Sequence, residues 1–127
     1  MKNRSPSRGQ TMVEYALMLP LLVLIILFLV DAGRAVYYFS VVHNAAREGA
    51  RWGVIDPVDT AGIEAAARAK TVGLDPAALT VYSDMPTEWT IRVRVTYNFD
   101  LVTPLISGLF GGNPLTLESV STMHVEG

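Results

Sequence analysis

The chain has 127 residues, no cysteine, a formal net charge of −2 and a hydrophobic fraction of 50%. This length allows one domain at most, and the lack of cysteine excludes disulfides and thiol chemistry. The net negative charge argues against a nucleic-acid partner. Much of the hydrophobic content is concentrated in residues 15–30, and the rest of the chain resembles a small soluble domain.

The N-terminal region combines a basic start with a long apolar run. Lys2, Arg4 and Arg8 come first, and Glu14 is the only charged residue among the 19 residues of 12–30. Since about 20 apolar residues cross a hydrocarbon core of ~30 Å, we expect residues 12–30 to span a membrane. The basic flank predicts a cytoplasmic N-terminus, with residues 31–127 outside the cytoplasm.

Glu14 calls for a functional explanation. A carboxylate in a membrane helix costs roughly 2.5–3.5 kcal/mol at the helix centre and less near the interface. Gly9, four further residues and then Glu14 at the entrance of an apolar helix resemble the processing site of a type IV prepilin. A conventional signal peptide is the alternative, but its apolar region is shorter, and Asp31-Ala32-Gly33-Arg34 is a poor match to its small-residue cleavage site.

We expect one helix from about residue 12 to residue 52, with its second half beyond the membrane. No proline occurs between Asp31 and Trp52, Gly53 suits a C-terminal cap, and Asp56-Pro57 prevents continuation. Such a helix would be ~60 Å long. Pro20 removes one helical hydrogen bond, and we expect a kink there.

Small residues mark one face of the projecting half of this helix. Ala45, Gly49 and Gly53 are four residues apart, a spacing that allows another backbone to approach closely. This helix-packing face could dock on the chain's own sheet, which we favour, or on the helix of a neighbouring subunit.

The remaining sequence predicts a small α+β head. Residues 59–72 read as a short helix ended by Gly73, and Asp75-Pro76 begins a turn that extends to Ala78. Three antiparallel strands are expected at residues 79–84, 88–101 and 116–126, with a hairpin connection at 84–87. The second strand alternates polar residues with a buried set: Trp89, Ile91, Val93, Val95, Tyr97 and Phe99. Residues 103–114 are expected to form an apolar loop or a short helix.

No residue pattern points to catalysis, a cofactor or a metal. The two histidines, His43 and His124, lack further ligands at metal spacing. Arg92 and Arg94 share the polar face of a strand, where we expect them to be solvated. The aromatic residues 37–39 suit a membrane surface. We therefore expect no enzymatic activity.

Two stretches together resemble the TadE-like proteins, pseudopilins of the tight-adherence (Flp) pilus system. The first is Arg8 to Leu17 followed by Pro20, and the second runs from Asp31 to Ala35 and on to Asn44-Ala45-Ala46-Arg47-Glu48-Gly49-Ala50-Arg51. The resemblance implies that a prepilin peptidase cuts between Gly9 and Gln10. It also implies that Glu14 faces the new amino terminus of a neighbouring subunit.

Two features depart from pilins in general. Gln10 is a less usual first mature residue than a hydrophobic one, and a head of about 70 residues exceeds that of major Flp pilins, which are mostly one helix. The division expected is a basic leader at 1–9, a transmembrane and projecting helix at 10–53, and an extracytoplasmic head at 54–127. Cleavage would remove three positive charges and leave a net charge of −5.

The leading hypothesis is a minor pilin or pseudopilin that acts in pilus assembly. It would be a single-pass protein of the inner membrane, and could be incorporated in an extracellular pilus. Its partners would be the prepilin peptidase, other pilin subunits and membrane lipid. The alternatives are a membrane-tethered binding module and a structural filament subunit.

Overall fold

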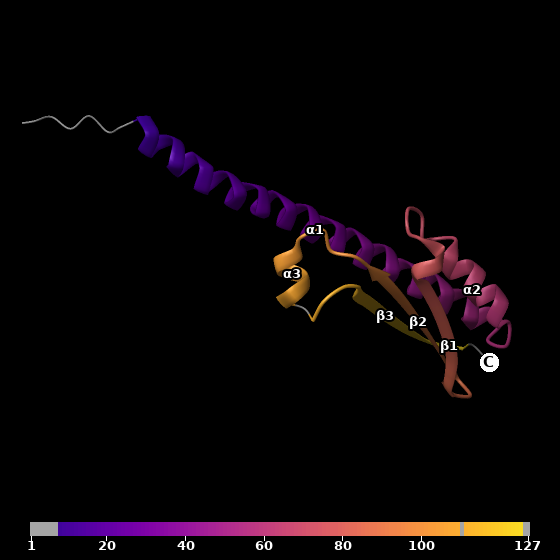
Figure 1. Ribbon diagram of the computed structural model, residues 1–127. Helices are drawn as coiled ribbons and strands as arrows, with labels where there is room; N and C mark the ends of the chain where they lie inside the picture. The colour runs from indigo at the N-terminus through magenta and orange to yellow at the C-terminus, as the bar shows by residue number, and fades with distance from the viewer. Residues whose placement is uncertain (1–7, 110, 126–127) are drawn as a thin grey trace, which may run out of the picture.

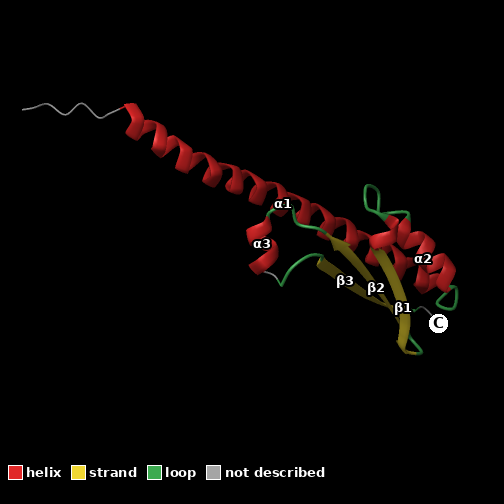
Figure 2. Ribbon diagram, viewed as in Figure 1, coloured by secondary structure: helices red, strands yellow, loops and turns green. Residues whose placement is uncertain are grey.

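The computed structural model describes residues 8–109 and 111–125. One long helix, α1 (Arg8–Ile55), continues through Pro20 and enters the head with its second half (Figure 1). The other elements, in chain order, are α2 (Thr60–Arg68), the 3-10 turn η1 (Pro76–Ala78), β1 (Leu79–Thr87), β2 (Thr90–Phe99), α3 (Pro104–Leu109) and β3 (Leu115–His124). This arrangement confirms the α+β class (Figure 2). Most of the expected leader, residues 1–7, and the expected strand end at Glu126 lie outside the described residues.

The C-terminal end of α1 corrects one prediction, because Gly53 lies inside the helix and does not cap it. The helix continues to Ile55, and the Asp56 amide still bonds the Trp52 carbonyl at 3.2 Å. Pro57 then disfavours helical geometry in the residue before it. A Cβ on Gly53 would lie 2.7 Å from Cγ1 of Ile91, so this position requires glycine for close packing.

Helix α2 is shorter than expected at its C-terminal end. Asp59 caps its N-terminus, where the carboxylate accepts a hydrogen bond from the Gly62 amide at 2.9 Å. The helix ends at Arg68 rather than near residue 72. The Arg68 carbonyl accepts bonds from both the amide and the hydroxyl of Thr71, and this local turn ends the helical ladder.

The sheet has the order β1-β2-β3 with both pairs antiparallel, and one face packs against α1 and α2. Its core comprises Val42, Ala45, Ala46, Ala50, Ile63, Ala67, Leu74, Leu79, Ile91, Val93, Val95, Tyr97, Phe99 and Leu101. On the other face, the Arg92 guanidinium hydrogen-bonds Asp84 and holds the pKa of that carboxyl below its ordinary value. Arg94 lies 3.6 Å from Glu118, so both arginines have acidic neighbours.

The β1–β2 hairpin also differs from the prediction. Strand β1 extends to Thr87, its register with β2 shifts between Asp84 and Thr87, and the turn falls at residues 88–89. Trp89 therefore lies in the turn with 59% of its surface exposed, and its expected place in the core is wrong. The alternation in the sequence already begins at Trp89, one residue before the strand starts at Thr90. A turn residue next to a strand can match the strand's alternation by chance.

We expect Val93→Asp to unfold the head. Val93 is fully buried where β2 packs against α1. An unpaired charge there should lower the free energy of unfolding by at least about 4 kcal/mol. Asn98→Asp is the matched control, because it adds the same charge to the exposed face of β2 and keeps the acceptor for the Thr116 hydroxyl. Denaturant unfolding in mild detergent, followed by circular dichroism, measures both. Equal destabilisation by the two variants would contradict the strand phase.

Candidate processing and assembly site

The three residues of the expected processing site lie in the first two turns of α1. Helix α1 begins at Arg8, so the bond between Gly9 and Gln10 lies in its first turn. A Cβ on Gly9 would meet nothing within 4 Å. A protease that binds extended backbone must unwind this turn. Unwinding is inexpensive, because the first amides of a helix have no intrahelical partner and glycine disfavours helix by about 1 kcal/mol relative to alanine.

Glu14 lies four residues after Gln10, so the two share a face of α1 and are about 6 Å apart along its axis. The Glu14 side chain is exposed. Within residues 8–109 and 111–125, no ion pair or hydrogen bond involves its carboxylate. The carboxylate is therefore available to a group outside the described chain.

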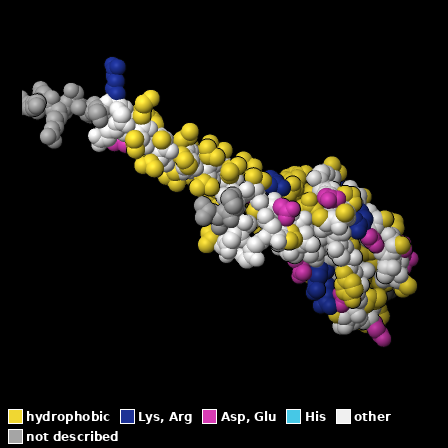
Figure 3. Space-filling model, in the orientation of Figure 1, with side chains coloured by type: hydrophobic (Ala, Val, Ile, Leu, Met, Phe, Trp, Pro, Cys, Tyr) yellow, Lys and Arg dark blue, Asp and Glu magenta, His cyan; other side chains and the backbone are white. Residues whose placement is uncertain are grey.

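The first half of α1 presents an apolar surface that the head leaves uncovered (Figure 3). Met12 is 75% exposed, Leu17 is 72% exposed and Leu29 is 62% exposed. Contiguous exposed apolar surface of this extent indicates a membrane or protein contact. By length and composition α1 can cross a membrane, which supports a single-pass membrane protein.

The small face of α1 lies against the chain's own head. Ala45 is fully buried, and a Cβ on Gly49 would lie 3.1 Å from Cγ1 of Val93 and 3.3 Å from Cβ of Ala67. Gly53 makes the corresponding close contact with β2 and α2. All three residues therefore contribute to the intramolecular core, the arrangement we favoured over docking on a neighbour's helix.

Asp31 has a structural role that the sequence analysis did not identify. Only 2% of its surface is exposed, and its carboxylate accepts hydrogen bonds from the amides of Val102, at 3.0 Å, and Thr103, at 2.7 Å. Burial acts to raise its pKa, but the two amides and the nearby Arg34 outweigh that effect and hold the pKa below its ordinary value. Asp31 thus binds the segment after β2 to α1 where the apolar run ends.

Arg34 completes this junction. Its guanidinium donates to Asp31 and to the Asp100 carbonyl, both at 3.3 Å, and lies 5.6–5.7 Å from the ring centres of Tyr38 and Phe99. Tyr38 also packs edge-on against Phe99. Such contacts favour a fixed guanidinium, so α1 and the end of β2 are held together by charge and by ring packing. A single Asp at the edge of an apolar run was the only sequence signal, and it fitted a simple membrane boundary equally well.

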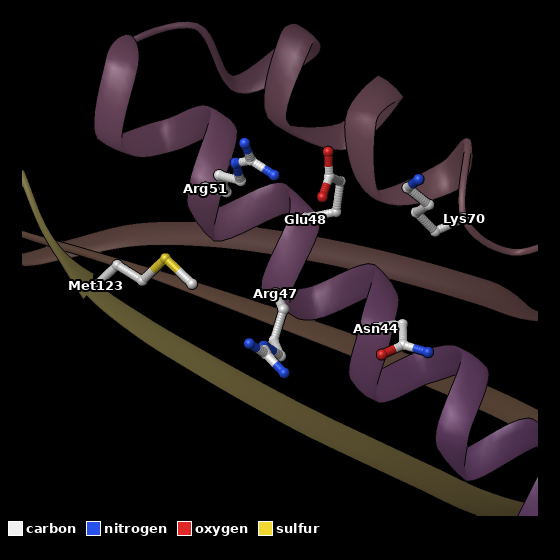
Figure 4. A pocket seen from close by; sticks show the side chains of 6 residues that line it. All are labelled: Asn44, Arg47, Glu48, Arg51, Lys70 and Met123. Carbon is white, nitrogen blue, oxygen red and sulfur yellow. The ribbon is translucent and has the colours of Figure 1, made fainter.

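An open depression lies beside the projecting half of α1 (Figure 4). It is lined by Asn44, Arg47, Glu48, Arg51, Lys70 and Met123. The side chains come from α1, the turn after α2 and β3, and the cations outnumber the single carboxylate. No catalytic arrangement is present in this set, because it has no nucleophile paired with a base.

The histidines have structural partners. Nδ1 of His43 lies 3.1 Å from the hydroxyl of Ser119, which joins α1 to β3, and Nδ1 of His124 lies 3.1 Å from the Trp89 carbonyl. In the described part of the chain, no three His, Asp or Glu side chains are grouped as metal ligands would be.

Comparison with known proteins gives one finding that bears on identity. Residues 9–51 match the family model described as TadE-like protein. The matched segment contains nearly all of α1, from Gly9 through Arg51, and none of the head beyond it. Searches of curated proteins and of solved structures gave no match. The resemblance to TadE-like proteins is thus confirmed for residues 9–51, which make up most of the long helix.

We expect Asp31→Asn to loosen the segment that follows β2. An asparagine oxygen can accept from one of the two amides, but its NH₂ group opposes the other. Hydrogen exchange at Val102 and Thr103 should therefore accelerate about ten- to hundredfold at neutral pH. Asp100→Asn is the control, because it removes a nearby exposed carboxylate and leaves both amide bonds in place. Unchanged exchange in Asp31→Asn would contradict the junction.

The same carboxylate predicts a pH dependence. Because its pKa is lower in the folded chain, Asp31 contributes stability above its ordinary value of about 3.9. This contribution is lost as the pH falls through the lower folded-state pKa. The slow exchange at Val102 and Thr103 should therefore persist at pH 5 and disappear only in stronger acid.

Proposed function

We propose that this chain is a prepilin-class precursor that acts as a minor pilin or pseudopilin in the assembly of a tight-adherence pilus. A prepilin peptidase removes residues 1–9, and Gln10 becomes the first residue of α1. The mature helix holds the protein in the inner membrane, and the head lies outside the cytoplasm. The match of residues 9–51 to TadE-like proteins supports this assignment.

The observation that carries the proposal is the isolation of Glu14 on an exposed apolar helix. It is the only charge in residues 12–30, and no side chain of the described chain pairs with it. A membrane tether gains nothing from such a carboxylate, which costs free energy in lipid. A pilin gains an intermolecular partner, because a neighbour's new α-amino group can neutralise it in a low-dielectric setting where a charge pair is strong.

The head favours an accessory subunit over a bulk filament subunit. Residues 56–125 add a sheet and helices to α1, so each copy would add considerable volume at the filament surface. The positive flank before Glu14 and the lone Asp31 after the apolar run support a cytoplasmic N-terminus.

The first test addresses processing. We expect Gly9→Leu to keep the leader attached, because the leucine side chain blocks approach to the backbone and strengthens the first helical turn by about 1 kcal/mol. Mass spectrometry of the wild-type protein from its native cell should find a chain that begins at Gln10. Gly33→Leu is the matched control, since Gly33 is also a helical glycine of α1 with nothing near its Cβ position. An intact leader in wild-type protein, or a start near residue 33, would overturn the prepilin assignment.

The second test addresses Glu14. We expect Glu14→Gln to be cleaved after Gly9 and inserted normally, yet to reduce the number of pili per cell, because it keeps the size of the side chain and removes its charge. Glu14→Asp keeps the charge and should restore much of the piliation. Pili are counted by electron microscopy, with cleavage checked on the same samples. Normal piliation with Glu14→Gln would favour the membrane-tethered binding module instead.

A further inference from the structure

We propose that the segment between β2 and β3, residues 101–114, inserts its tip into the membrane leaflet nearest the head. Lipid would therefore contact the protein at two places, along the first half of α1 and at α3. The inference rests on the part of the proposed function that places α1 across a membrane, and it does not depend on pilus assembly. We call this segment the α3 loop.

The position of the α3 loop along α1 sets its depth. Thr103 and Ile106 line one groove together with Leu21, Leu24, Ile25 and Phe28 of the apolar run, and Figure 1 shows α3 beside the middle of α1. Phe28 and Leu21 lie about 3 Å and about 14 Å along the helix axis below Val30, the last apolar residue before Asp31. If residues 12–30 occupy the bilayer, Thr103 lies near its head-side surface beside Asp31, and Ile106 faces the apolar side chains of the groove below it. Interfacial segments penetrate to a similar depth, about 5–10 Å.

The composition of the α3 loop suits this depth. Residues 101–117 contain no charged side chain, and the nearest charges are Asp100 and Glu118 on either side. Leu109 is 82% exposed and Val102 is 54% exposed. A water-facing loop between two strands has no need of such a sequence, whereas in a bilayer each charge would be costly.

Several backbone polar groups of the α3 loop also have hydrogen-bond partners within the chain, as an apolar medium requires. Irregular backbone is excluded from hydrocarbon unless its polar groups have partners. The Asn113 side chain bonds both the amide and the carbonyl of Leu101, and Asp31 accepts from the next two amides. At the end of α3, the Gly112 amide bonds the Ser107 carbonyl, with both Gly111 and Gly112 at positive φ.

These observations favour lipid, rather than a second copy of the chain, as the partner that contacts the α3 loop and the groove beside it. The groove beside α3 is continuous with the exposed surface of α1, which must itself lie in an apolar medium. The two side chains that bond the loop backbone, Asp31 and Asn113, come from the same chain, so the backbone groups that they bond need no partner from a neighbour. A bilayer that surrounds α1 therefore also reaches the tip of the loop.

Single-cysteine labelling tests the proposal in the full chain, which has no native cysteine. Leu109→Cys carries the environment-sensitive fluorophore NBD, and the protein is reconstituted at low density into phosphatidylcholine–phosphatidylglycerol vesicles. Lipids with a nitroxide on the acyl chain act as quenchers. We expect blue-shifted emission and at least about threefold more quenching than at a water-exposed position of the head.

Two further positions serve as controls. Val58→Cys is matched to Leu109→Cys, because both residues are apolar and 82% exposed, but Val58 follows α1 at the far end of the head. Leu22→Cys reports the membrane span itself. Quenching at Leu22 without quenching at Leu109 would overturn the insertion of the loop and leave the span intact.

Two other outcomes would also overturn the proposal. A blue shift at Leu109 that requires high protein density and occurs without lipid quenching would assign the loop to contact between copies. Loss of quenching at both Leu22 and Leu109 would remove the membrane span, and with it the membrane premise of the proposed function. Normal piliation with Glu14→Gln, in contrast, would leave the insertion of the loop unaffected.

Discussion

The close approach of α1 to the sheet is the constraint on which the head depends. At Gly49 and Gly53 even a methyl group would lie within 3.1 Å of a β2 side chain. Alanines fill the neighbouring positions of the same face, so the helix backbone itself forms part of the core. A small head of this kind has little apolar area to bury, and close packing of the long helix adds to the area that its three strands bury.

One consequence is that the head has no flexible connection to the apolar half of α1. The helix is continuous from Arg8 to Ile55, and its buried residues begin with Asp31 and recur through Gly53. A displacement of the helix along its axis would therefore carry the head with it. This coupling suits a subunit that is drawn out of a membrane during assembly, whereas a tethered binding module works equally well with a flexible linker.

The sequence predicted the elements with strong periodic signals and was less accurate at their ends. The apolar run, the α+β class and the alternation from Ile91 to Phe99 were correct, because burial imposes a period that the residues reveal directly. The errors at Gly53 and Trp89 share one cause. A glycine near a helix end and an aromatic residue near a strand start each have two common uses, and only tertiary packing shows which applies.

The role of Asp31 illustrates a different limit. Its partners are the amides of residues 102 and 103, about 70 positions away in the chain. Nearly every residue carries a backbone amide, so the sequence does not reveal which amides bond Asp31. The proposed processing residues are the opposite case, because the spacing of Gly9 and Glu14 is visible in the sequence itself. The geometry adds that the bond between Gly9 and Gln10, the proposed cleavage point, lies within the first turn of α1, which sequence patterns had placed before the helix.

Asp31 and Glu14 flank the same apolar run, and they differ in whether their carboxylates have partners within the described residues. The Asp31 carboxylate has two amides and Arg34 as partners, so its burial is compensated within the chain. The Glu14 carboxylate has no such partner in the described residues, and a charge left uncompensated in an apolar medium is strongly disfavoured. The described residues therefore account for Asp31 but supply no partner for Glu14. If the proposed function holds, a second molecule supplies the compensating charge, and the α-amino group of a neighbouring chain has the required sign.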